Sequence, residues 1–275
     1  MSVSSPRIIT GVVSLALLSL TACSSSVPVR VGTQEFYWSA ARETYAAGDY
    51  RKTADHLEKL IEANDSYAAR AVPWYLVLTS GMAAGYMDLA DNYTAGARRS
   101  KANALAFRLK ATEYRTASSR LALRFAQNVD KIDRVPLGTM PLAFPLPNGN
   151  AAQPALLSRI ASGIEITPAD ALAAEALTIQ HSVLMTVCLA AGSPNDVAKA
   201  EEIFGRPSSG TSRAIFGQAI AHLLETESTL YTRDKLDDPE KLSAFRQRAQ
   251  NVLAEANRAG SARVVQIGAV TTARP

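Results

Sequence analysis

Apolar residues recur along most of the chain at intervals of three and four, which is the period of an amphipathic α-helix. Alternating β-branched positions, which are typical of strands, occur only near residues 264–272. We therefore predict an all-α fold, built from helical hairpins stacked into a bundle or a short solenoid. After residue 155 the expected helices cover 155–163, 168–191, 194–204, 211–231 and 238–259.

The clearest hairpin lies between residues 36 and 64. Gly48 can adopt the left-handed conformation that ends a helix, and Asp49 can cap the next helix. This segment resembles a tetratricopeptide repeat in Tyr37-Trp38, Tyr45, Gly48-Asp49-Tyr50, Ala54 and Leu57. It departs from the family at Thr53, where a small alanine is expected.

A looser second copy follows the first. Trp74 stands 36 residues after Trp38, and Ala83-Ala84-Gly85 repeats the Ala-Ala-Gly of the first turn, which predicts a second hairpin within 74–97. A weaker third match is Ala190-Ala191-Gly192. The alternative is that unrelated hairpins look alike, because each must bury one face and turn at glycine.

A long helix is expected over residues 98–134. One apolar seam runs through Phe107, Ala111, Tyr114, Ser118, Leu121, Phe125, Asn128 or Val129, and Ile132. Leu105, Leu109 and Leu123 form a second stripe. Because both sides are apolar, we expect this helix to be a central member of the bundle.

Basic residues gather in the same segment, which predicts an anionic contact. Arg98, Arg99, Lys101 and Arg108 are the first of ten, against three acidic residues. Lipid headgroups, lipopolysaccharide phosphates, peptidoglycan carboxylates or an acidic protein would suit this charge. The favoured alternative is a solvated face with ion pairs to neighbouring hairpins. The net charge of the whole chain is only +4, so no nucleic-acid partner is expected.

Residues 135–154 form a Pro-rich connecting loop in which we expect no regular structure. This loop separates N-terminal hairpins and a long helix (35–134) from C-terminal helices (155–260), and residues 261–275 are expected to form a tail. The loop also contains Met140, Phe144 and Leu146, so we expect it to cross an apolar groove of the body.

The N-terminus carries the most specific motif. Its apolar run, residues 8–20, is too short to span a bilayer and suits a cleaved secretory signal. Leu20-Thr21-Ala22-Cys23 resembles the lipobox of bacterial lipoproteins. The resemblance implies a signal peptide at 1–22, acyl chains such as palmitate on Cys23, and a tether at 23–34. Because Asp does not follow the cysteine, it also implies an outer-membrane location facing the periplasm.

Candidate chemistry elsewhere is sparse. The composition, 47% hydrophobic and 20% charged, is typical of globular proteins and excludes wholesale disorder. Cys188 lies in an apolar run and is expected to fill the core. His222 and Glu225 are one turn apart, but no further ligands accompany them, so neither a metal nor another cofactor is expected. His181 is expected to be a hydrogen-bonded core residue.

Four aromatic residues, Tyr45, Tyr50, Trp74 and Tyr86, are candidates for a binding groove, although simple hairpin packing is the preferred interpretation. The leading hypothesis is a non-catalytic, lipid-anchored adaptor whose groove binds an envelope protein. One alternative is a small-molecule module, because the anchor and early hairpins faintly resemble the T components of TRAP-type transporters. The second alternative is a cell-wall enzyme, which would need a cleft with perturbed carboxylates or histidines.

Overall fold

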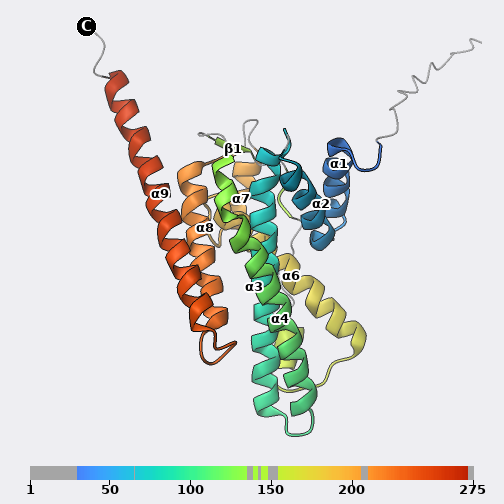
Figure 1. Ribbon diagram of the computed structural model, residues 1–275. Coiled ribbons are helices and arrows are strands. Elements are labelled where there is room, and N and C mark those ends of the chain that lie inside the picture. Colours follow the sequence, from blue (N-terminus) through green and yellow to red (C-terminus); the bar gives the residue numbers. More distant parts are fainter. Residues whose placement is uncertain are drawn as a thin grey trace, which may run out of the picture.

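The computed structural model confirms the all-α class (Figure 1). It describes residues 30–64, 66–134, 139–141, 144–147, 154–205 and 210–271. The predicted signal peptide and Cys23 lie outside the described residues. The helices are α1 (Gln34–Ala46), α2 (Tyr50–Ala63), α3 (Ala68–Arg99), α4 (Ala104–Asn128), η1 (Val129–Arg134), α5 (Pro154–Ala161), α6 (Pro168–Ala190), α7 (Val197–Phe204), α8 (Arg213–Ser228), η2 (Thr229–Tyr231) and α9 (Pro239–Thr271).

Helices α1 and α2 form the predicted first hairpin. Gly48 has a φ of 75°, and the Asp49 carboxylate accepts a hydrogen bond from the backbone N–H of Lys52 at 3.1 Å. Thr53 is fully buried, and its hydroxyl lies 3.0 Å from that of Thr44 in α1. The departure from the tetratricopeptide pattern therefore places a polar contact between the two helices.

The predicted second hairpin is wrong, because α3 continues unbroken through Ala83-Ala84-Gly85. A Cβ atom on Gly85 would lie 2.9 Å from the Cα of Ile179 in α6. One turn earlier, a Cβ on Gly81 would lie 2.8 Å from the Cα of Val183. These glycines let α3 and α6 approach closely, and neither makes a turn.

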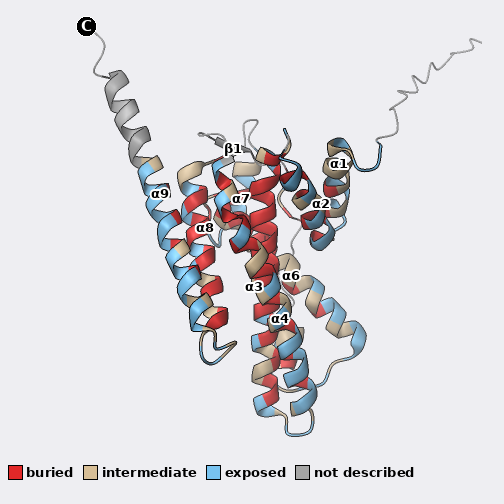
Figure 2. Ribbon diagram, viewed as in Figure 1, coloured by how far each residue is buried: buried red, intermediate tan, exposed pale blue. Residues whose placement is uncertain are grey.

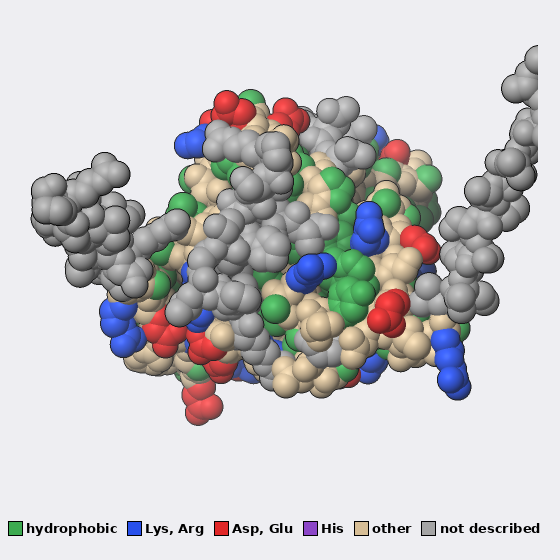
Figure 3. Space-filling view, turned by 90° about the horizontal axis from the view of Figure 1, so that it is seen from above, with side chains coloured by type: hydrophobic (Ala, Val, Ile, Leu, Met, Phe, Trp, Pro, Cys, Tyr) green, Lys and Arg blue, Asp and Glu red, His purple; other side chains and the backbone are tan. Residues whose placement is uncertain are grey.

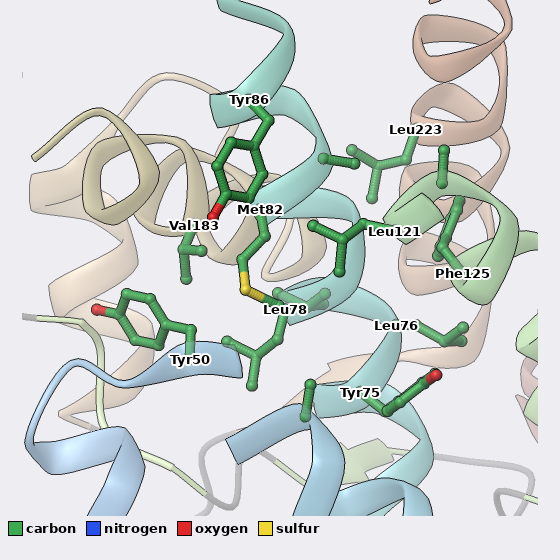
Figure 4. Packing of buried hydrophobic residues seen from close by; sticks show 14 of the residues in the cluster. Tyr50, Tyr75, Leu76, Leu78, Met82, Tyr86, Leu121, Phe125, Val183 and Leu223 are labelled. Atoms are coloured by element: carbon green, nitrogen blue, oxygen red, sulfur yellow. The ribbon is translucent and has the colours of Figure 1, made fainter. Parts of the chain in front are cut away.

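Helix α3 is the centre of the bundle. It packs against α2, α4, α5, α6 and α8, and it is buried on nearly all sides. By contrast, residues 239–260 of α9 and the end of α4 near the α3–α4 turn are largely exposed (Figure 2). Buried side chains of α3, among them Tyr75, Leu76 and Leu78, meet those of α4 and α8 in one core (Figure 4). The arrangement is a bundle around one helix.

The expected long helix starts later than predicted. Arg98 and Arg99 end α3, and α4 begins only at Ala104 after a turn. The predicted seam from Phe107 to Ile132 is buried throughout, which confirms the inward face. The second stripe is not packed as expected, because Leu105 is 70% exposed and Leu109 is 64% exposed. Helix α4 lies on one side of α3 and is not itself central.

The Pro-rich segment contains regular structure, contrary to expectation. Strand β1 (Thr139–Pro141) pairs antiparallel with β2 (Gly210–Ser212), with Thr139 opposite Ser212. An extended segment can satisfy its backbone polar groups on a second extended segment, even when proline ends the pairing. Farther along, Phe144 is buried against Trp38 and Trp74, which confirms that the loop crosses an apolar surface.

The C-terminal half follows most of its predicted turns. Gly192 has a φ of 83°, and Asp196 caps α7, so the weak third match marks a real helical hairpin. Gly260 does not end the last helix, because α9 extends to Thr271 through much of the predicted tail. A glycine inside a helix costs only about 1 kcal/mol relative to alanine, so α9 can continue through Gly260. A Cβ atom added at Gly260 would lie 3.6 Å from the Cβ of Ala214 on α8.

Helix α6 is the one helix in the described ranges whose length and apolar composition would suffice to cross a bilayer. In this fold, 44% of its most apolar window is buried, and the helix packs along α3. Part of its remaining surface borders the two clefts described next.

Candidate binding groove

A cleft of about 670 Å³ lies between the α1–α2 turn, α3, residues 145–147 and α6. Three of the four aromatic candidates, Tyr45, Tyr50 and Tyr86, line it. Tyr50 and Tyr86 approach the same space from α2 and α3, with Met82 between them (Figure 4). The structure therefore brings together aromatic residues from separate helices into one concave surface.

Trp74 lies beneath this cleft and is not among its lining residues. It is only 3% exposed and packs edge-on against Tyr45, with ring centroids 5.5 Å apart. Phe144 packs against both rings. The Tyr45 hydroxyl donates a hydrogen bond to the Pro145 carbonyl at 2.7 Å, and burial raises the Tyr45 pKa well above its usual value. The aromatic cluster thus holds the Pro-rich segment against the body and fixes the cleft wall.

A second cleft, of about 490 Å³, adjoins the first on the surface of α6. Its walls come from α3, α4 and the segment before α6, and they include Tyr93, Phe107, Tyr114 and Ile166. Leu172 and Glu175 line both clefts. We call the two clefts together the α6 groove.

Glu175 is the polar residue at the junction of the two clefts. The hydroxyl of Tyr86 donates to its Oε1 at 3.2 Å, and the hydroxyl of Tyr114 donates to its Oε2 at 3.1 Å. The two tyrosine rings stack at 5.8 Å. The local sequence marks Glu175 only as an acid in an apolar helix, because its partners lie 61 and 89 residues away in the chain.

The predicted anionic contact gathers at the turn between α3 and α4. Arg98, Arg99, Lys101 and Arg108 are all exposed there. Arg99 donates to the Ala161 carbonyl at 3.1 Å, and within the described ranges no ion pair joins the other three to an acid. Arg124, later in the basic segment 98–134, does form the expected ion pairs to a neighbouring hairpin, with Asp55 and Glu58 of α2. The anionic partner stays a prediction.

A smaller cleft of about 260 Å³ between α3, α6 and α8 brings Asp88, His181 and His222 together. Burial, and then the charge of Asp91, raise the Asp88 pKa above its usual value. The Nδ1 atom of His181 is buried and has no hydrogen-bond partner among the described residues, contrary to the expected hydrogen-bonded core histidine. Within the described residues, no group of three or more metal-binding side chains is placed to hold an ion.

Cys188 is fully buried, as expected for a core residue, and burial raises the pKa of its thiol to about 11. A thiol with so high a pKa is a poor nucleophile at neutral pH.

No family model, curated protein or solved structure matches this chain.

Proposed function

We propose that this protein is a non-catalytic, lipid-anchored adaptor of the bacterial envelope, whose α6 groove binds a segment of a partner protein. In this proposal, acyl chains on Cys23 hold the chain at the outer membrane, facing the periplasm. Two or three acyl chains make such anchoring effectively permanent. The anchor also raises the local concentration of the groove near partners in the same membrane.

The observation that carries the proposal is the continuity of the two clefts along α6. Together they offer an elongated concave surface, joined at Leu172 and Glu175, of which Leu172 is 70% exposed. Protein-binding surfaces are enriched in aromatic residues, and several tyrosine rings lie beside the exposed leucine here. A rigid aromatic side chain loses little conformational entropy on binding. Seen from above, hydrophobic side chains also gather next to charged ones on the end of the molecule where α3 begins (Figure 3).

Site-specific photocrosslinking tests this function in living cells. A photoreactive amino acid replaces Leu172 in the groove or, as a matched control, the exposed Leu253 of α9. We expect a discrete crosslinked protein from position 172 and none from position 253. With Cys23→Ser the yield should fall, because the groove is no longer concentrated at the membrane. Equal crosslinking from both positions would contradict a specific groove.

A small-molecule module is the second candidate, because each cleft alone falls within the 300–1,000 Å³ typical of ligand sites. Under this alternative, an apolar ligand would raise the unfolding temperature of the purified protein, and position 172 would give no protein crosslink.

The cell-wall enzyme hypothesis has its most suitable location in the cleft of Asp88, His181 and His222, which is separate from the α6 groove. Loss of a measured hydrolytic activity on Asp88→Asn, but not on Glu175→Gln, would support it. The same pair of variants would then argue against an adaptor role.

A further inference from the structure

Glu175 has unused hydrogen-bonding capacity that points to the chemistry of a ligand. Its side chain is partly buried and accepts one hydroxyl hydrogen bond on each oxygen. An ionised carboxylate can accept about four hydrogen bonds. Capacity therefore remains for donors that enter from either cleft.

Within the described ranges, no ion pair joins Glu175 to a basic side chain. Two cations stand nearby. Lys110 lines the second cleft, but its Nζ is already 2.8 Å from Glu113 and lies 5.7 Å from the Tyr114 ring centroid. Arg51 lines the first cleft beside Tyr86. Hydroxyl groups therefore hold the Glu175 carboxylate in place. After the hydrogen bond to Glu113, the charge of Glu175 also helps to raise the pKa of Lys110, but Glu175 forms no ion pair with a basic side chain in the described part of the chain.

The negative charge also reaches the aromatic walls. Burial raises the pKa values of Tyr86 and Tyr114, and the charge of Glu175 is the second cause in both. For Tyr86, the nearby charge of Arg51 opposes this rise. Aromatic faces and an unpaired carboxylate together favour a cation that loses part of its hydration.

We propose that the α6 groove binds a lysine or arginine side chain of its partner, with the cationic head at Glu175 and the aliphatic stem against the apolar wall. Leu172 and Ile166 offer that wall, and Tyr93 adds an aromatic face. The inference rests on the proposed function and specifies the partner as a basic segment. A charged head with an apolar stem matches this mixture of surfaces better than a compact ion would.

Titration calorimetry with a matched pair of probes tests the inference. The probes are acetyl-Ala-Lys-Ala-amide and the same tripeptide with neutral norleucine in place of lysine, titrated into the full chain in detergent. We expect the lysine probe to bind at least tenfold more tightly. Glu175→Gln should abolish this preference, because the amide carries no charge. Its oxygen can still accept from one tyrosine hydroxyl, and its NH2 group can donate to the oxygen of the other. Free n-butylammonium has the charged head and the stem of lysine without a peptide backbone. If the groove recognises a side chain within a peptide, n-butylammonium should bind more weakly than the lysine probe.

Glu255→Gln is the matched control, since Glu255 is an exposed carboxylate that lines a different cleft, between α8 and α9. This variant should keep the lysine preference. Equal binding of the two peptides, no measurable binding of either, or unchanged preference in Glu175→Gln would overturn the inference. The Leu172 crosslink decides the proposed function separately, so a retained crosslink with no lysine preference would reject the cation site alone.

Discussion

The burial of a single side chain depends on its place in the helix and on which other helices surround it. The seam of α4 was predictable residue by residue, because a helix repeats every 3.6 positions and its inward face stays apolar. The exposure of Leu105 and Leu109 could not be predicted in this way, because it depends on which helices pack against α4. Glu175 likewise gains its partners only through tertiary packing. The local sequence therefore identified the core better than it identified the groove.

Glu227 gives a prediction at this scale. It is 3% exposed at the interface of α8 with α3, and among the described residues neither carboxylate oxygen makes a hydrogen bond of normal geometry, although Ser80 of α3 lies nearby. Burial raises its pKa to about 8, although nearby Ser80 opposes the rise. In the unfolded chain a glutamate ionises near pH 4.3. Between these values the unfolded state releases a proton that the folded state keeps, so stability falls as pH rises from about 4.3 to 8.

The variant Glu227→Gln should remove this pH dependence and be more stable than the parent at pH 7. Each unit of pKa difference corresponds to about 1.4 kcal/mol, so the effect amounts to several kcal/mol. Urea unfolding at pH 5 and pH 8 measures it. If both proteins lose the same free energy of unfolding between these pH values, Glu227 is not the responsible group.

At the scale of elements, caps predicted helix ends well where the signal is local. Gly48 with Asp49, and Gly192 with Asp196, both mark turns, because a left-handed glycine and a capping carboxylate act within a few residues. Gly85 lies in an identical Ala-Ala-Gly sequence but sits inside α3. Whether glycine turns the chain or permits close packing depends on a partner helix more than 90 residues away, which the local sequence does not contain.

The glycines of α3 and α9 therefore predict opposite effects of the same substitution. Gly85→Ala gains helix propensity but forces its Cβ to within 2.9 Å of the α6 backbone, so a net destabilisation of about 1 to 2 kcal/mol is expected. Gly260→Ala meets only an ordinary contact at 3.6 Å and should stabilise the protein by up to about 1 kcal/mol. Thermal unfolding of the two variants compares them directly. Stabilisation by Gly85→Ala would show that α3 and α6 do not pack as described.

For the whole molecule, the helical class was predictable from periodicity, but the arrangement around α3 was not. The sequence favoured the segment 98–134 as a central member of the bundle, because it is apolar on two sides, yet α3 contacts more of the other helices. The β1–β2 pair and the α6 groove also join segments far apart in the chain. Such contacts depend on packing among all the helices, which no single period reveals.

The most direct test of the central claim is to fill the groove and measure the size of the native complex. Ala176 lines the first cleft and is exposed, so Ala176→Trp places a large ring in the groove, whereas Ala254→Trp places it on an exposed position of α9. The complexes are extracted from membranes in mild detergent and sized by native electrophoresis. We predict that the parent and Ala254→Trp migrate as a larger complex and that Ala176→Trp migrates alone. An unchanged complex in Ala176→Trp, or no complex in the parent, would contradict the account.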